Sequence, residues 1–201
     1  MSALTLLGWR RAVQHVYADV RRCPDPAEGH ALWRAGRDEL VATHPDSPIP
    51  VAHRGSFHGL SYAPYDPALR WTLPVLAAEP GSRRVPTATD GVVPFARIGR
   101  VELPDGLGSL DLWWLEQYGG GLFLPMRDAT AGRTTYGGGR YLLDTVKGAD
   151  LGGSADGSAL VVDLNFAYQP SCAYDPAWEC PLAPPGNVLP GEINAGELYD
   201  H

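Results

Sequence analysis

An acid and an amide two residues apart form the first candidate site. Asp163 and Asn165 lie in LVVDLNFAY (160–168), where apolar residues at every second position predict a strand. Two residues along a strand span about 6.6 Å, so both side chains would project from one face. Such a pair suits the polar edge of a small substrate, or a hard cation if a third oxygen ligand is supplied. The alternative is structural: the two side chains cap nearby loop amides at a strand end.

A glycine-rich bend, TTYGGGRY (134–141), forms the second candidate site. Three glycines leave bare backbone between Tyr136 and Arg140, which can approach a ligand closely or present N–H groups to an anion. The planar guanidinium of Arg140 would then bind a carboxylate or a phosphate. The alternative is a tight entry into a strand, with Arg140 paired to Asp128 or Asp163 as a structural ion pair. The motif is neither a P-loop nor a dinucleotide-binding fingerprint.

Two cysteines flank a proline turn in CAYDPAWEC (172–180) and are close enough in sequence to meet. A zinc site would need two further ligands at short spacing, and no histidine lies between His58 and His201. We therefore predict no metal here. Cys172 and Cys180 are either two packed thiols or one disulfide, and the third cysteine, Cys23, has no assigned role.

Two helices are predicted to precede these motifs. The first covers residues 4–21, where apolar residues recur at helical spacing. The second begins with Asp25 as N-cap, Pro26 at the first helical position and Glu28 completing a capping box. It ends near His44, because proline follows.

Beyond residue 45 the helical pattern stops and short apolar stretches alternate with glycine and proline turns. Six predicted strands lie in ALRWTLPVL (68–76), GVVPFARIGRVEL (91–103), SLDLWWLEQY (109–118), GLFLPM (121–126), GRYLLD (139–144) and SALVVDLNF (158–166). This spacing predicts a mainly β fold, an antiparallel barrel or a roll or sandwich. We predict a single domain over 1–201, with a helical pair in 1–45, the β barrel or roll in 46–168, and a long irregular wrapping segment in 169–201.

Composition excludes several classes of partner. The chain has 201 residues, an apolar share of 44% and a net charge of −7, as expected of an ordinary globular protein. An acidic chain without a run of basic residues is not expected to bind nucleic acid, which requires phosphate neutralisation. No apolar run approaches about 18 residues and no signal peptide is recognisable, so we expect no membrane association and a cytoplasmic location.

Several motifs together resemble a known family. They are RDATAGRTTYGGGRYLLD (127–144), DLNFAYQPSCAY (163–174), CPLAPPGN (180–187) and AGE (195–197), with WRAGRDEL (33–40), SPIP (47–50) and FHGLSY (57–62) upstream. They resemble the uncharacterised bacterial domain-of-unknown-function family 1684. The resemblance marks Thr130, Tyr168, Asn187 and Glu197 in addition to the residues above, and it implies no activity.

Two classes of function remain open. The first is a small-molecule-binding protein, with or without catalysis, that takes a small polar or anionic substrate in a barrel-mouth pocket without a cofactor. Its catalytic candidates are Asp163, Asp128 and Tyr136. Its candidates for substrate binding are Arg140, Asn165, Thr130, Tyr168, Asn187 and Glu197. The second is a non-catalytic β-module whose polar motifs form a structural hydrogen-bond network.

A metal site made by Asp163, Glu197 and His53 is a third, weaker reading. The main interpretations differ in one respect: whether Arg140, Asp163, Asn165 and Glu197 converge on one pocket. The sequence does not determine the oligomeric state.

Overall fold

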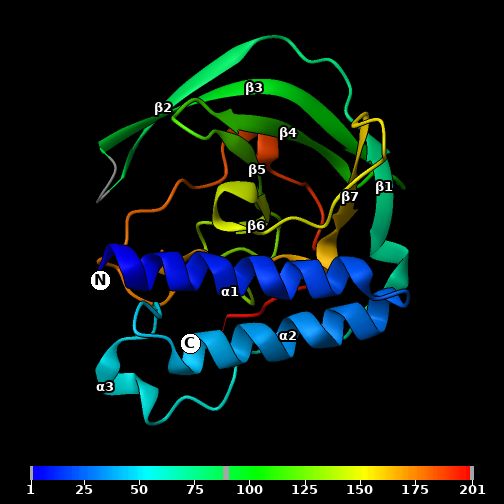
Figure 1. Cartoon of the computed structure of the whole chain (residues 1–201). Coiled ribbons are helices and arrows are strands. Elements are labelled where there is room, and N and C mark those ends of the chain that lie inside the picture. Colours follow the sequence, from blue (N-terminus) through cyan, green and yellow to red (C-terminus); the bar gives the residue numbers. More distant parts are fainter. Residues whose placement is uncertain (1, 88–90, 200–201) are drawn as a thin grey trace.

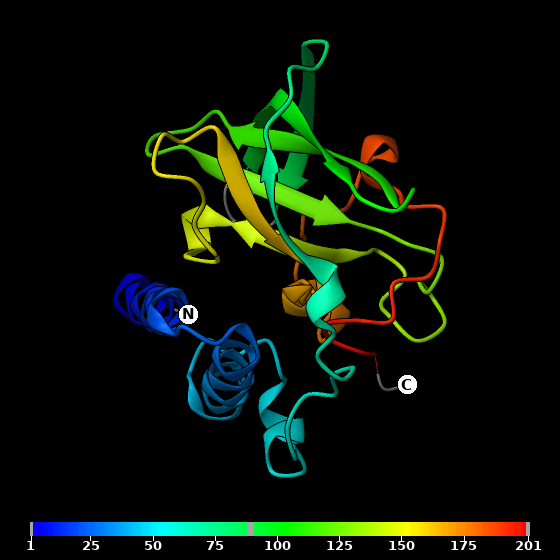
Figure 2. The same cartoon turned by 90° about the vertical axis from the view of Figure 1, so that its right-hand side faces the viewer.

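The computed structural model describes residues 2–87 and 91–199. Two long helices, α1 (Ala3–Arg22) and α2 (Pro26–Thr43), lie side by side along one side of the strands (Figures 1 and 2). The strands form two antiparallel sheets. The larger sheet has the order β2 (Gly81–Thr87), β3 (Gly91–Leu103), β4 (Gly108–Leu115), β5 (Gly121–Met126) and β6 (Arg140–Asp144), and the smaller sheet pairs β1 (Arg70–Pro74) with β7 (Ala159–Asp163). The described sheets do not close into a barrel, so the roll or sandwich form of the prediction is the one that fits.

Both long helices lie within one residue of the bounds that their sequence predicts, but of the capping box predicted at Glu28 only the Asp25 bonds are present. Asp25 caps α2 by accepting hydrogen bonds from the backbone N–H groups of Ala27 and Glu28, and Pro26 is its first residue. The helix ends at Thr43, two residues before Pro45.

The two helices pack closely because Gly36 faces Val16. A Cβ atom at position 36 would lie 2.6 Å from a Val16 methyl carbon, so only glycine allows this approach without a shift. The indole of Trp33 on α2 donates a hydrogen bond of 3.1 Å to the hydroxyl of Tyr17 on α1. Both side chains are buried in a cluster with Phe166, which fastens the helix pair to the β part of the molecule.

The six predicted strands are present. They are β1 (Arg70–Pro74), β3 (Gly91–Leu103), β4 (Gly108–Leu115), β5 (Gly121–Met126), β6 (Arg140–Asp144) and β7 (Ala159–Asp163). The sequence missed β2 (Gly81–Thr87), a strand at the sheet edge whose residues GSRRVPT include two arginines and a proline. Charged residues and proline are tolerated at edges, and they hide the strand pattern.

The strand predicted over 160–168 is wrong in its second half. The strand β7 ends at Asp163, whose carboxylate accepts a hydrogen bond of 3.0 Å from the backbone N–H of Asn165. This bond caps a 3₁₀ turn, η3 (Leu164–Phe166), so the chain leaves the sheet there. A second correction is a short helix, α3 (Val51–Arg54), where only strands were expected.

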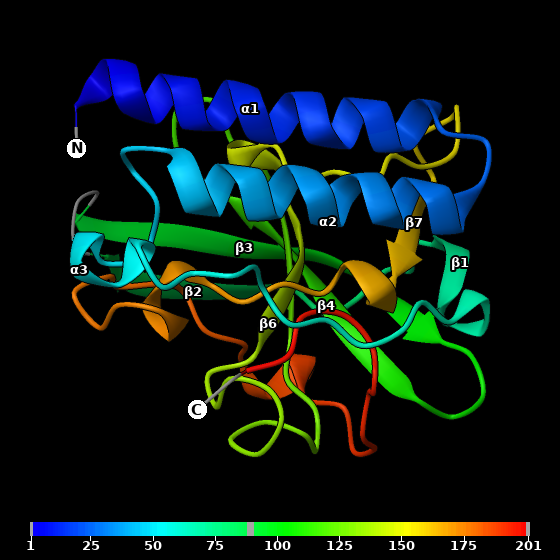
Figure 3. The same ribbon diagram turned by 90° about the horizontal axis from the view of Figure 1, so that it is seen from below.

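Residues after 168 are irregular, as predicted. Up to residue 199 their only helical elements are the 3₁₀ turns η4 (Ser171–Ala173) and η5 (Pro185–Asn187), and the chain passes beneath the sheets before it returns toward residue 199 (Figure 3). Ile193 and Ala195 of this segment join the main core, together with Leu110, Leu142 and Leu164. The segment is therefore part of the packed interior, although it has no regular structure. No helix in the described ranges is long and apolar enough to cross a membrane.

Candidate functional site

Arg140 lies in a buried cluster that holds the C-terminal segment. Only 1% of the residue is exposed. Its guanidinium donates hydrogen bonds to the backbone carbonyls of Ile193 at 3.2 Å and Glu197 at 3.3 Å, and also to that of Ala195. Asp128 Oδ1 lies 3.4 Å from Arg140 Nη2 and forms an ion pair with it. Burial lowers the pKa of Arg140, and Asp128 opposes that effect.

Asp128 and Thr130 complete the same cluster. Asp128 Oδ2 accepts a 2.6 Å hydrogen bond from the backbone N–H of Ile193. The hydroxyl of Thr130 lies 2.9 Å from Asp128 Oδ1 and 2.8 Å from the hydroxyl of Thr135. These polar groups bind one another and the returning chain, so the arrangement matches the structural ion pair that the sequence left open for Arg140.

The glycine bend serves backbone packing. Gly139 has φ +91°, and a Cβ atom there would lie 2.5 Å from the carbonyl oxygen of Met126 on β5. Glycine permits both the left-handed conformation and this close approach. The bare backbone thus brings β6 against β5 at the point where Arg140 enters the core.

Asp163 and Asn165 form a separate buried cluster. Asp163 Oδ1 accepts a 2.8 Å hydrogen bond from the Asn165 amide, and its Oδ2 pairs with Arg70 at 3.2 Å. The amide of Asn165 also exchanges two 2.8 Å hydrogen bonds with the backbone of Asp66, and His30 Nε2 donates to the Asn165 carbonyl at 3.0 Å. Burial raises the pKa of Asp163, while Asn165 and Arg70 oppose the effect. This geometry is the loop-capping alternative described above.

Asn187 connects the irregular C-terminal segment to the five-stranded sheet by hydrogen bonds. Its amide group donates 2.8 Å hydrogen bonds to the carbonyls of Asp111 and Pro125, and its oxygen accepts one of 3.0 Å from the Trp113 indole. These partners occupy both ends of the amide, and the side chain is fully buried. Asn187 therefore lies in a structural position.

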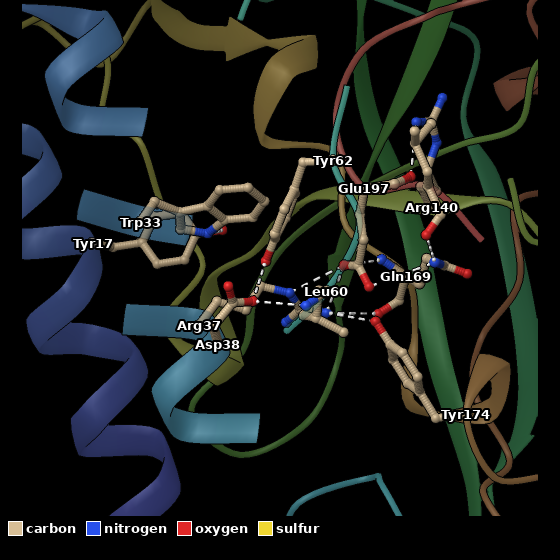
Figure 4. A network of polar contacts seen from close by, with 11 residues as sticks. Tyr17, Trp33, Arg37, Asp38, Leu60, Tyr62, Arg140, Gln169, Tyr174 and Glu197 are labelled. Atoms are coloured by element: carbon tan, nitrogen blue, oxygen red, sulfur yellow. Dashed lines mark hydrogen bonds and ion pairs between the residues drawn. The ribbon is translucent and has the colours of Figure 1, made fainter. Parts of the chain in front are cut away.

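Glu197 lies in a fourth cluster, centred on Arg37 of α2 (Figure 4). Glu197 is fully buried, and its Oε2 accepts hydrogen bonds from Arg37 Nη2 at 2.8 Å, Arg37 Nε at 3.1 Å and the Gln169 backbone N–H at 3.1 Å. Arg37 Nη2 also donates to the Gln169 carbonyl and the Tyr174 hydroxyl, both at 3.3 Å. The guanidinium carbon lies 4.8 Å from the ring centre of Tyr168.

Burial raises the pKa of Glu197, and the nearby Arg37 guanidinium opposes that effect. Arg37 was missed by sequence reasoning. A signal was present, because Arg37 follows Trp33 by one helical turn and so interrupts the face of α2 that packs inward.

A cavity lies between the helix pair and the β part, and we call it the interlayer cavity. Its helical wall consists of Trp9, Val13, Val16, Tyr17, Trp33, Gly36, Arg37 and Leu40. Its other lining residues are Pro48, Tyr141, Asp144, Lys147, Ala149, Tyr168, Gln169, Pro170, Ser171, Tyr174 and Cys180. About 80 Å³ of the interlayer cavity can be reached by the centres of water molecules, several times what one water needs.

The predicted site residues thus lie in different places. Tyr168 and Cys180 line the interlayer cavity, and Glu197 lies behind its wall, bound to Arg37. Tyr136 and Cys172 line a second cavity that also includes Cys180. The expected single pocket around Arg140 and Asp163 is not formed, because their side chains bind different partners.

The described residues include no group of three or more histidines, cysteines or acids arranged to hold a metal ion. The metal site considered for Asp163, Glu197 and His53 is not formed, because its two acids bind other partners. Asp163 is paired with Arg70 and Glu197 with Arg37, in separate clusters.

The comparisons with known proteins agree with the fold and assign no activity. Residues 55–198 match the model of a family described as "Protein of unknown function (DUF1684)". The solution NMR structure of an uncharacterized protein from Haloarcula marismortui is similar, with 34% sequence identity and a TM-score of 0.56. The similarity covers 82% of this chain and 89% of that one. No curated protein is significantly similar in sequence.

Proposed function

The chain belongs to the DUF1684 family of proteins of unknown function, and we propose its function from the geometry of the interlayer cavity. The protein binds a small, uncharged, mainly aromatic molecule that carries neighbouring hydrogen-bond donor and acceptor groups. One observation carries this proposal: Gln169 lines the cavity, is 97% buried, and its side-chain oxygen has no hydrogen-bond partner among the described residues.

The lining of the cavity favours an aromatic guest. Two tryptophans, Trp9 and Trp33, lie on the helical side, and tyrosines 141, 168 and 174 lie on the other. Ligand sites in proteins are commonly of this type, mostly apolar with a few placed polar groups. Flat aromatic walls stack well on a flat guest and exclude water from it.

The charges at the cavity favour an uncharged guest. The guanidinium of Arg37 is neutralised by the carboxylate of Glu197, and Lys147 forms an ion pair of 3.2 Å with Asp144. An anion would have to compete with carboxylates that already hold these cations, and a cation would meet the same two positive side chains. The earlier expectation of an anionic group depended on Arg140, which lies in its own buried cluster.

Two polar atoms beside Arg37 can recognise the guest. The side-chain oxygen of Gln169 is an acceptor without a donor, and an unpaired buried acceptor costs about 1–3 kcal/mol. The hydroxyl of Tyr174 accepts a bond from Arg37 and retains its own hydrogen for donation. Arg37 binds the backbone carbonyl of Gln169 and the hydroxyl of Tyr174, so the two residues are neighbours, and an amide or a lactam offers a group for each of them.

Four fragments of one shape test the proposal by ligand-observed NMR on the full chain: benzamide, benzoate, benzylamine and toluene. We expect benzamide to bind with a Kd of about 1 mM, or about −4 kcal/mol, and the other three at least about tenfold more weakly. Equal binding of all four, or tightest binding of benzoate, would contradict the proposed recognition.

A pair of tryptophan variants locates the bound fragment. Val13→Trp places an indole in the interlayer cavity and should abolish benzamide binding. Leu4→Trp adds the same group at a position that is 80% exposed on the same helix, and should leave binding unchanged. Retained binding in Val13→Trp would show that the fragment binds elsewhere.

The alternative function, a non-catalytic module with a structural hydrogen-bond network, applies to residues outside the interlayer cavity. The clusters around Arg140, Asp163 and Asn187 are buried and mutually hydrogen-bonded, which supports a structural role for those motifs. Such a role is compatible with ligand binding in the interlayer cavity, because none of those three residues lines it.

A further inference from the structure

The two cysteines of the C-terminal segment meet at one cavity. Cys172 and Cys180 both line it, together with Tyr136 and Trp178, and both are partly exposed. The turn around Pro176 brings the two thiols together from opposite ends of a nine-residue stretch. We call this site the thiol cavity.

The titratable groups of the thiol cavity influence one another. Burial and the neighbouring Cys172 raise the pKa of Tyr136 to about 12. The neighbouring Cys180 and burial raise the pKa of Cys172. The two thiols are therefore close enough to interact, and the interaction favours a thiolate at Cys180.

The electrostatics agree with the geometry. The neighbouring Cys172 thiol, aided by Lys147 and opposed by burial, lowers the pKa of Cys180 to about 6. The same interaction and burial raise the pKa of Cys172. Cys180 therefore forms a thiolate at lower pH than Cys172 does.

We propose that Cys180 and Cys172 form a redox-active dithiol that hydroperoxides oxidise to an intramolecular disulfide. This assignment is independent of the ligand proposed for the interlayer cavity. It rests on two partly exposed thiols that line one cavity and belong to one short stretch of the chain around Pro176.

The chemistry balances in two steps. The Cys180 thiolate attacks the terminal oxygen of the hydroperoxide, the O–O bond breaks, and a proton from water yields Cys180 sulfenic acid and an alcohol, or water if the oxidant is hydrogen peroxide. The sulfur of Cys172 then attacks the sulfenic sulfur, its proton leaves with the hydroxyl group as water, and the S–S bond forms. Two electrons pass from the dithiol to the peroxide, and a thiol reductant reverses the oxidation.

Mass spectrometry of the full chain tests the disulfide. The reduced protein is treated with one equivalent of hydrogen peroxide, quenched with iodoacetamide and mapped by peptides. We expect Cys172 and Cys180 to escape alkylation and to appear in a linked peptide about 2 Da lighter than the free dithiol peptide, the mass of the two hydrogens removed. In Cys172→Ser the reaction should stop at Cys180 sulfenic acid, which dimedone traps. Cys23→Ser is the matched control and should oxidise like the wild type.

Alkylation kinetics provide a test that needs no variant. At pH 5.5 a thiol of pKa about 6 is about 24% thiolate, against about 0.1% for an ordinary thiol of pKa 8.5. The lower nucleophilicity of the more acidic thiolate cancels roughly tenfold of that advantage. Iodoacetamide should therefore modify Cys180 in the folded chain about 10–25 times faster than in the same chain unfolded in urea.

The charged and titratable groups near Cys180 set this profile: Cys172, Lys147, Tyr136 and Tyr141, together with Glu179, which lines the same cavity. Removing the neighbouring thiol in Cys172→Ala should move the alkylation midpoint of Cys180 upward from pH 6. Equal alkylation of folded and unfolded chains, or oxidation that mainly links Cys23, would overturn the proposal.

Discussion

Replacing Arg37 by methionine should destabilise the protein strongly. The carboxylate of Glu197 is fully buried, and the two Arg37 hydrogen bonds of 2.8 and 3.1 Å supply its only cation within 4 Å among the described residues. The variant would leave that charge unpaired and would also remove the donor to the Gln169 carbonyl. Removing one partner of a buried pair costs about 3–5 kcal/mol.

That loss corresponds to a fall in Tm of roughly 6–20 °C for a chain of this size. Urea unfolding followed by tryptophan fluorescence measures the free energy directly. The double variant Arg37→Met/Glu197→Gln should recover much of the loss, because no uncompensated charge remains. The matched control is Arg34→Met, one turn away on α2, where an exposed arginine lies 4.8 Å from the Tyr62 ring and should contribute about 0.5–1 kcal/mol.

The reasoning would be refuted if Arg37→Met cost less than about 1 kcal/mol, since a buried Glu197 carboxylate could not then depend on this cation. Failure of the double variant to recover stability would instead show that Arg37 acts through packing on Tyr168. This double-mutant cycle therefore separates the electrostatic contribution of the Arg37–Glu197 pair from the packing contribution of the Arg37 side chain.

Two further predictions concern residues away from the cavities. Burial lowers the pKa of His30 to about 4, so the stability held by its neutral form is present above pH 6.5 and is lost as pH falls toward 4; His30→Phe should flatten that part of a urea-unfolding pH profile. A profile unchanged by the substitution would contradict this. Gly139→Ala should cost clearly more than the about 1–2 kcal/mol expected for Gly132→Ala, because both have positive φ but only position 139 places the new Cβ against the Met126 carbonyl. Equal losses of stability for the two variants in thermal unfolding would show that the positive φ angle alone causes the loss and that the contact with Met126 adds nothing.

Local sequence patterns were enough to predict most of the helices and strands. The N-cap Asp25, the first-turn Pro26 and the stop before Pro45 act through bonds within a few residues, so the helix α2 follows from its own sequence. The same holds for β3 and β5, whose bounds match the predicted stretches. The sequence analysis missed the edge strand β2 because its residues have only a weak intrinsic preference for strands, and pairing with β3 overrides that preference.

Candidate site residues were recognised by type, but their roles depended on partners far along the chain. Arg140 could serve an anion site or an ion pair, and the choice was made by carbonyls of residues 193–197, more than fifty positions away. Asp163 and Asn165 were expected on one strand face, yet the bond between them ended the strand. No local pattern encodes where a returning irregular segment lies.

The amino-acid sequence by itself determined the helix pair, most strands, the irregular C-terminal segment and the presence of two nearby thiols, because each depends on short-range spacing and turn chemistry. Only the tertiary structure decided which polar side chains are neutralised and which face a cavity. It placed Arg37 against Glu197, 160 residues apart, and enclosed space between the helix pair and the β part. The physical reason is that burial and charge pairing are properties of surfaces brought together by folding, and these surfaces belong to segments with no contact in the extended chain.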